Sequence, residues 1–115
     1  MNIDAYNTAG VGADITNLSF STSEVRSVIM NIAVYRHTDS GTITEHSTIL
    51  AVYNADNSPG SLWELSRDYV GDARITFAMS DTGQVSFVIR ASDGALAGTN
   101  YTGFLSYTAK ALLNT

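Results

Sequence analysis

Apolar residues that alternate with a period of two constrain the fold of this chain more than any other feature. In Val28–Arg36 both alternating sets are largely apolar, which is typical of a strand covered on both sides. The segments 42–53 and 101–111 show the same period, and in the second one face is apolar and the other mostly polar. Clusters of turn-forming residues separate these segments. The pattern predicts β-strands joined by short turns.

The turn Ser80–Gly83 allows a test of strand register. If Ser80 pairs with Gln84 across a three-residue loop, the apolar residues before and after the turn fall opposite one another on one face. The pairs are Ile75 with Ile89, Phe77 with Phe87, and Met79 with Val85. A two-residue loop would send half of this face to water, so we predict the three-residue register.

The turn Thr38–Gly41 has a similar sequence, Thr-Asp-Ser-Gly, and predicts a second hairpin. If its loop is the same, His37 faces Ile43 and His46 faces Val34. Opposite parity then places the two histidines on different faces of the sheet. We therefore expect no metal site from the two histidines.

The remaining segments complete the expected fold. Residues 1–24 are rich in polar residues and predict a polar N-terminal arm, with one strand near Leu18–Ser21. The segment 61–68 fits a strand better than a short helix, and 109–113 could end the last strand as a short helix. We predict an all-β chain, an antiparallel β-sandwich or jelly roll of about six to eight strands, with residues 25–115 forming a single domain.

Composition excludes several classes of function. The net charge is −5, with 6 Lys and Arg against 11 Asp and Glu, so nucleic-acid binding through a basic patch is not expected. The sequence contains no cysteine, which excludes disulfide scaffolds and thiolate metal sites. No apolar run approaches the roughly 20 residues of a membrane-spanning helix. We expect no membrane insertion and no cofactor.

Catalytic and metal-binding patterns are weak. Glu64, Asp68 and Asp72 are close in sequence but are interleaved with arginines, and strand alternation would spread them over both faces. Asn54–Gly60 has oxygen-bearing side chains at alternate positions, but its glycine stands seventh and a leucine twelfth, against the sixth and twelfth positions of a calcium loop. We therefore predict no catalytic and no metal-ligating residues, and the chain is not expected to be an enzyme.

Candidate contact residues lie in and beside the loops. Amide and carboxylate side chains of the 54–60 loop can bind a partner, and nearby aromatic rings can stack on a sugar or anchor a protein contact. The alternative for these rings is that they close the ends of the core. The candidate residues for contact with a partner or glycan are Asn54, Asp56, Asn57, Trp63, Tyr69 and Tyr101.

Two C-terminal stretches resemble the C-terminal domains of tail fibres and related appendages of tailed bacteriophages. The first is GDARITF at 71–77 with GQVSF at 83–87, and the second is GTNYTGFLSYTAKAL at 98–112. The resemblance implies a β-sandwich domain of a phage particle, a virion structural protein that forms a homotrimer and acts in assembly or host attachment. Its partners would be further copies, other virion proteins and a glycan or protein of the host surface.

Other functions stay open at this point. The chain length suits a small separate virion protein, such as a capsid decoration protein. A monomeric carbohydrate-binding module would instead bind a free glycan without self-association. A small glycosidase is the third alternative, and it would need a carboxylate pair that the sequence does not display.

Overall fold

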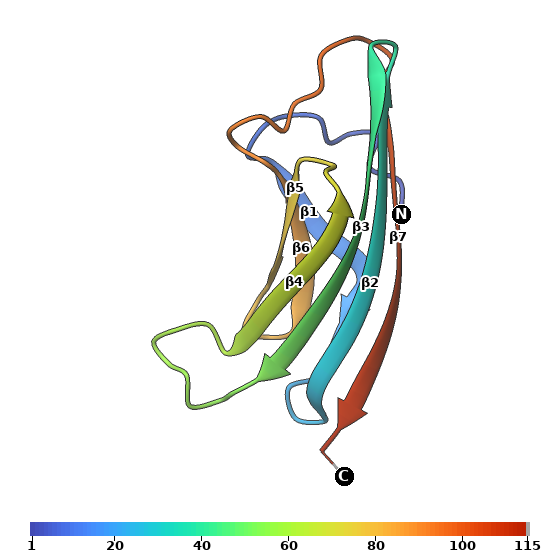
Figure 1. The fold of residues 1–115 in the computed structure, drawn as a ribbon. Helices are drawn as coiled ribbons and strands as arrows, with labels where there is room; N and C mark the ends of the chain where they lie inside the picture. Colours follow the sequence, from blue (N-terminus) through green and yellow to red (C-terminus); the bar gives the residue numbers. More distant parts are fainter. Residues whose placement is uncertain (115) are drawn as a thin grey trace.

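The computed structural model describes residues 1–114, which form two antiparallel β-sheets facing each other (Figure 1). The described residues form strands, turns and loops, and they include no helix of the length and apolar character that a membrane-spanning helix needs. The strands are β1 (Gly12–Ser19), β2 (Val25–Thr38), β3 (Gly41–Tyr53), β4 (Trp63–Gly71), β5 (Ile75–Met79), β6 (Gln84–Ile89) and β7 (Thr102–Leu113).

The two sheets differ in size. The smaller sheet has the strand order β1-β6-β5, and the larger has β4-β3-β2-β7. The predicted all-β antiparallel sandwich is therefore confirmed, with seven strands. Most of the segment 61–68 belongs to strand β4, and residues 109–113 continue β7 without a helix.

Residues 1–24 supply one edge of the smaller sheet and part of the core. Strand β1 pairs with β6, and the N-terminal segment before it runs along β7, where the Ile3 amide donates to the Gly103 carbonyl at 2.9 Å. Ile3, Ile15 and Leu18 are all buried. This stretch therefore packs against the strands that follow it.

The β5–β6 hairpin has the predicted register. Ile75 pairs with Ile89, and the other two predicted apolar pairs are also present. The Ser80 amide donates to the Gln84 carbonyl at 2.9 Å, which closes the three-residue loop. Five of these six residues lie in the core, and Phe77 is partly buried, so the register follows from the burial of one apolar face.

Gly83 in this turn predicts a measurable cost of substitution. Its φ is +93°, and an added Cβ would lie 2.0 Å from the Phe20 carbonyl oxygen. Gly10 has a similar φ of +80° but open space around it. We expect Gly10→Ala to lower the free energy of unfolding by about 1 kcal/mol and Gly83→Ala by about 2–3 kcal/mol, in urea denaturation. An equal loss of unfolding free energy in the two variants would contradict a steric cost at Gly83 and leave only the cost of its backbone conformation.

The β2–β3 hairpin does not have the predicted register. Thr38 pairs with Gly41 across a two-residue loop, so His37 pairs with Thr42 and His46 with Ala33. The predicted pairs of His37 with Ile43 and His46 with Val34 are therefore wrong. Ala33 and His37 are four residues apart on β2, so their side chains point to the same face of the sheet. Because His46 on β3 is paired with Ala33, the two histidines lie on the same face.

The core lies between the sheets. From Val28 onward β2 contributes its even-numbered residues, and β3 contributes the odd-numbered ones between Glu45 and Ala51, while the alternate residues point outward. The fully buried large side chains are Ile3, Ile15, Leu18, Met30, Arg36, Ile32, Ile49, Ile75, Val85, Phe87, Ile89 and Leu105. Arg36 is the one charged member of this set, and its contacts are described below.

Candidate functional site

The loop between β3 and β4 projects from one end of the sandwich (Figure 1). Asn54 and Asp56 are exposed, and Asn57 is partly buried. The Asn54 side-chain oxygen accepts from the Asp56 amide at 3.1 Å, and the Asn57 side-chain amide donates to the Ser61 carbonyl at 2.7 Å. Both amide side chains therefore shape the loop, and the exposed carboxylate of Asp56 stays accessible to a partner.

Trp63 follows this loop but lies in the core. Only 2% of its surface is exposed, and its ring packs against Tyr53 at a centroid distance of 5.3 Å. Its indole nitrogen has no hydrogen-bond partner among the described residues. A ring in this position cannot stack on a ligand from solvent, so Trp63 is not part of an open contact surface in this conformation.

The other two aromatic candidates are held by arginines. Tyr69 is 53% exposed on β4, and the Arg67 guanidinium lies 4.8 Å from the centre of its ring. The Tyr101 hydroxyl accepts from Arg36 Nε at 3.0 Å, next to the start of β7. This end of β7 is opposite the end where the 54–62 loop projects, so the six candidate residues do not form one site.

The histidines are also separate. His37 Nδ1 lies 2.6 Å from the Thr42 hydroxyl, and His46 Nε2 lies 3.3 Å from the Asn31 side-chain oxygen. They share a face, but four residues of strand separate their positions, which is about 13 Å. Residues 1–114 contain no cluster of three or more His, Asp or Glu side chains that could hold a metal ion.

Asp39 ties the β2–β3 turn to the loop before β7. Its carboxylate accepts from both the amide and the hydroxyl of Thr99, and these hydrogen bonds hold its pKa below the usual aspartate range. A lowered pKa means that the contribution to stability is present above the ordinary value of about 3.9 and is lost as the pH falls through the lowered value.

We therefore expect an acid-dependent loss of stability between about pH 5 and pH 2, measured as the urea midpoint at each pH. Hydrogen bonds also lower the pKa of three other aspartates. The donor to Asp4 is the Gly103 amide, and the donor to both Asp72 and Asp93 is Arg90. Asp39→Asn and Thr99→Val should each make the acid dependence shallower. An unchanged acid slope in both variants would contradict this role for the Asp39–Thr99 contact.

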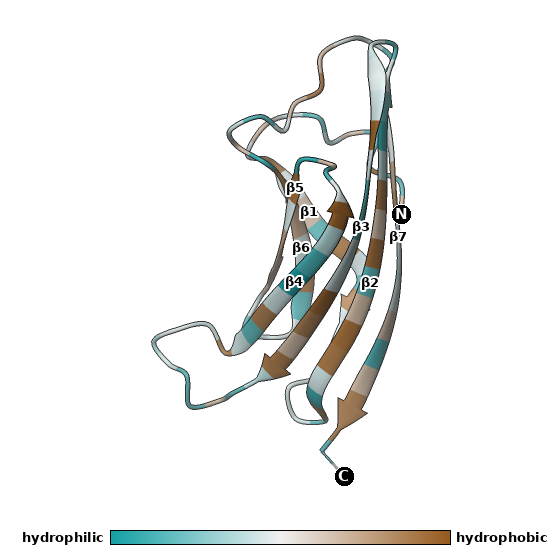
Figure 2. Ribbon diagram, in the orientation of Figure 1, coloured by the Kyte–Doolittle hydropathy of each residue, from teal (hydrophilic) through white to brown (hydrophobic). Residues whose placement is uncertain are grey.

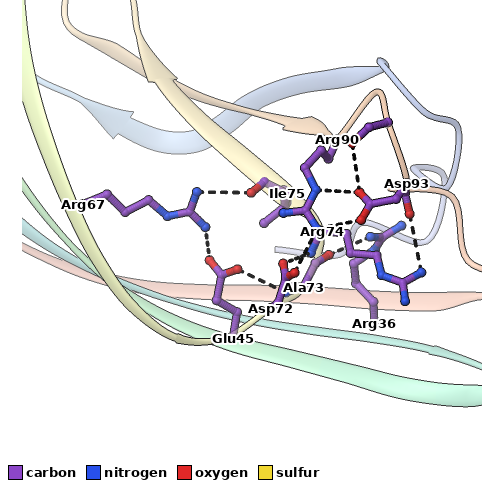
Figure 3. Close-up of polar contacts among 10 residues, drawn as sticks. Arg36, Glu45, Arg67, Asp72, Ala73, Arg74, Ile75, Arg90 and Asp93 are labelled. Atoms are coloured by element: carbon purple, nitrogen blue, oxygen red, sulfur yellow. Dashed lines mark hydrogen bonds and ion pairs between the residues drawn. The ribbon is translucent and has the colours of Figure 1, made fainter.

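Two polar clusters, centred on buried charged residues, join the larger sheet to the segments around it (Figure 3). Arg36 is fully buried and donates to the carbonyls of Ala73 and Gly94 at 2.7 and 2.8 Å. Glu45 is also buried, accepts from the Ala73 amide at 3.1 Å, and forms an ion pair with Arg67. Every contact here links segments that are far apart in sequence, so both clusters stabilise the framework that carries the exposed surfaces.

The outer face of the larger sheet carries most of the exposed large apolar side chains among the described residues. Figure 2 shows hydrophobic residues along the lower parts of β3, β2 and β7, whereas the middle of β4 is hydrophilic. The exposed large apolar residues that point outward from this sheet are Ile29, Tyr35, Leu50, Val52, Val70, Phe104 and Leu112. Exposed apolar side chains gathered on one face in this number are typical of an interaction surface.

Part of this face is hollowed. A hollow of about 660 Å³ is lined by outward-facing residues of all four strands, including Ile29, Leu50, Val52, Glu64 and Lys110. The outward position of Lys110 is level with Ile29, and that of Glu64 is level with Val52. An apolar floor with a charged group on each edge can accommodate an apolar partner surface that carries charges of its own.

Comparisons with known proteins show a likeness in fold. No protein-family model and no curated protein matches the chain. A solved structure that it resembles is the tailspike protein of Acinetobacter phage vB_ApiP_P1, with a TM-score of 0.51 and 15% sequence identity. The match covers 91% of this chain and 20% of the tailspike chain, so this chain spans about a fifth of that protein's length. At this identity, the comparison shows a β-fold shared with part of a phage tail protein.

Proposed function

We propose that this chain is a non-enzymatic structural domain of a bacteriophage particle, of the tail-fibre or tail-appendage type. The observation that carries the proposal is the fold likeness to a domain-sized part of a phage tailspike, which extends over 91% of the chain. The GDARITF and GTNYTGFLSYTAKAL stretches support the same class of protein from the sequence.

The proposed role has two parts. Copies of the chain associate as a homo-oligomer, a trimer, and contact other virion proteins. The projecting 54–60 loop, with Asn54, Asp56 and Asn57, and the exposed ring of Tyr69 are available for host attachment. The apolar outer face of the larger sheet supports association, because an isolated domain would expose it to water.

Electron microscopy of purified particles with a gold-labelled antibody against this chain tests the location. We expect labels at the tail, and mass spectrometry of the same particles should detect the chain. Labels over the capsid surface would support a capsid decoration protein instead. Particles without the chain would contradict any structural role in the virion.

A further inference from the structure

We propose that a second copy of this chain packs on the outer face of the larger sheet, with the rotation axis along the strands and β4 of one copy against β7 of the other. This inference rests on the self-association in the proposed function and assigns the surface that performs it. Three features of the face support it, namely its apolar residues, its size and its charge pattern.

Apart from the exposed Arg26 near the start of β2, the outward residues of the two central strands include no Lys, Arg, Asp or Glu. Ile29 and Leu50 point outward as direct neighbours on β2 and β3, with 46% and 50% of their surfaces exposed. Val52 and Leu112 extend the patch toward one end of the sheet, at 42% and 63%. The solvated face of an antiparallel sheet is normally polar, so this apolar end of the face has the character of a buried surface.

The size of the face suits a stable interface. Four strands about 4.8 Å apart are about 19 Å wide, and a strand of 12 residues such as β7 is about 40 Å long. The face therefore offers roughly 750 Å², close to the roughly 800 Å² that each partner contributes to a standard interface. With a two-fold axis, two such sheets would pack face to face about 10 Å apart, whereas with a three-fold axis each face would border the faces of two other copies.

The charges on the two edges of the face have opposite signs. Strand β4 points Glu64 and Asp68 outward, and the register places Ser66 between them, level with Lys110 on β7. Lys110 is the one lysine of the chain, and no acidic side chain points outward from β7. The face is thus acidic along one edge and basic along the other.

This charge pattern determines how a second copy can approach. A rotation axis along the strands brings β4 of one copy to β7 of the other at the same height, so Lys110 meets Glu64 and Asp68. A two-fold axis across the strands would place β4 on β4 and bring the carboxylates together, which is unfavourable. Two-fold and three-fold axes along the strands both satisfy the charges, so the inference is compatible with a trimer.

Sedimentation equilibrium over a wide concentration range tests the apolar part of the inference. We expect the wild-type chain to associate. The double variant Ile29→Thr/Leu50→Thr should raise the dissociation constant at least tenfold, because two apolar contacts are lost. Threonine keeps the strand preference, and circular dichroism checks that the fold is intact. Val11→Thr is the matched control, since Val11 is 44% exposed but precedes β1 of the other sheet.

Charge reversal tests the pairing of the edges. Lys110→Glu alone and Glu64→Lys/Asp68→Lys alone should each weaken association about tenfold or more. The combined variant should restore it, because the opposite signs face each other again. Asp14→Lys on β1 is the control, because it reverses an exposed charge on the other sheet.

The outcomes separate this inference from the proposed function. An oligomer whose dissociation constant is unchanged in all face variants would overturn the assignment of the surface and leave self-association intact. Weakening by the single reversals without restoration in the combined variant would overturn the pairing of β4 with β7. A wild-type chain that stays monomeric at every concentration would overturn both this inference and the proposed self-association.

Discussion

Arg36→Met is expected to lower the free energy of unfolding by about 4–5 kcal/mol, a large share of the stability of a domain of this size. Methionine can fill the space of the aliphatic stem but cannot donate hydrogen bonds. The change leaves four acceptors without their donor, which are the carbonyls of Ala73 and Gly94, the Asn7 side-chain oxygen and the Tyr101 hydroxyl. Urea denaturation followed by circular dichroism measures the loss.

The reason for so large an effect is the position of these acceptors in the chain. They belong to the N-terminal segment, the link between β4 and β5, and the loop before β7, and Arg36 holds all three to β2. Arg26→Met is the matched control, because Arg26 is exposed on the same strand. Arg36→Lys should fall between the two, since lysine keeps the charge but not the planar fork. Equal stability of the Arg36→Met and Arg26→Met variants would contradict this account.

The two hairpins show when the sequence predicts strand register correctly and when it does not. In the β5–β6 hairpin one set of alternating residues is apolar and the other is not, so the register follows from burial. In the β2–β3 hairpin both sets are apolar. Leu50 and Val52 would suit the core about as well as Ile49 and Ala51, so alternation cannot determine the register.

In the structure Ile49 and Ala51 are the buried residues of this part of β3, and this explains the apolar character of the outer face. The set left outside still carries Ile29, Leu50 and Val52. The apolar character of both faces predicts a strand covered on both sides, but the structure covers only one face, and the other is exposed. The excess of apolar residues is therefore the sequence signal for the surface proposed as the interface.

The buried polar clusters were missed because their residues are not close in sequence. Arg36 follows Val28, Met30, Ile32 and Val34 at the same parity, so the alternation itself placed an arginine in the buried row. An arginine in such a row indicates buried acceptors, but the sequence does not reveal that Ala73 and Gly94 supply them. Trp63 shows the opposite case, because its place beside a loop suggested exposure while the fold turns its ring inward.

Glu45→Ala is expected to lower the free energy of unfolding by about 3–5 kcal/mol. Glu45 is buried on β3, and its carboxylate accepts from Arg67, from the Ser47 hydroxyl at 2.6 Å and from the Ala73 amide. Removing it leaves a partly buried guanidinium and two polar groups without their partner. The loss should exceed that of an exposed ion pair severalfold.

A double-mutant cycle with Arg67→Ala isolates the ion pair from the other contacts of Arg67, which also donates to the Ile75 carbonyl at 3.2 Å and lies over the Phe77 ring at 4.9 Å. We expect a coupling energy of about 2–3 kcal/mol between Glu45 and Arg67, since low exposure limits screening by solvent. The control cycle is Asp72→Ala with Arg90→Ala, whose side chains are 52% and 31% exposed, and its coupling should stay below about 1 kcal/mol. Equal coupling in the two cycles would contradict the idea that burial strengthens the Glu45–Arg67 pair. A larger coupling at Glu45 and Arg67 would show that the buried carboxylate fixes Arg67 in place on the larger sheet, from which Arg67 reaches the Ile75 carbonyl on β5 of the smaller one.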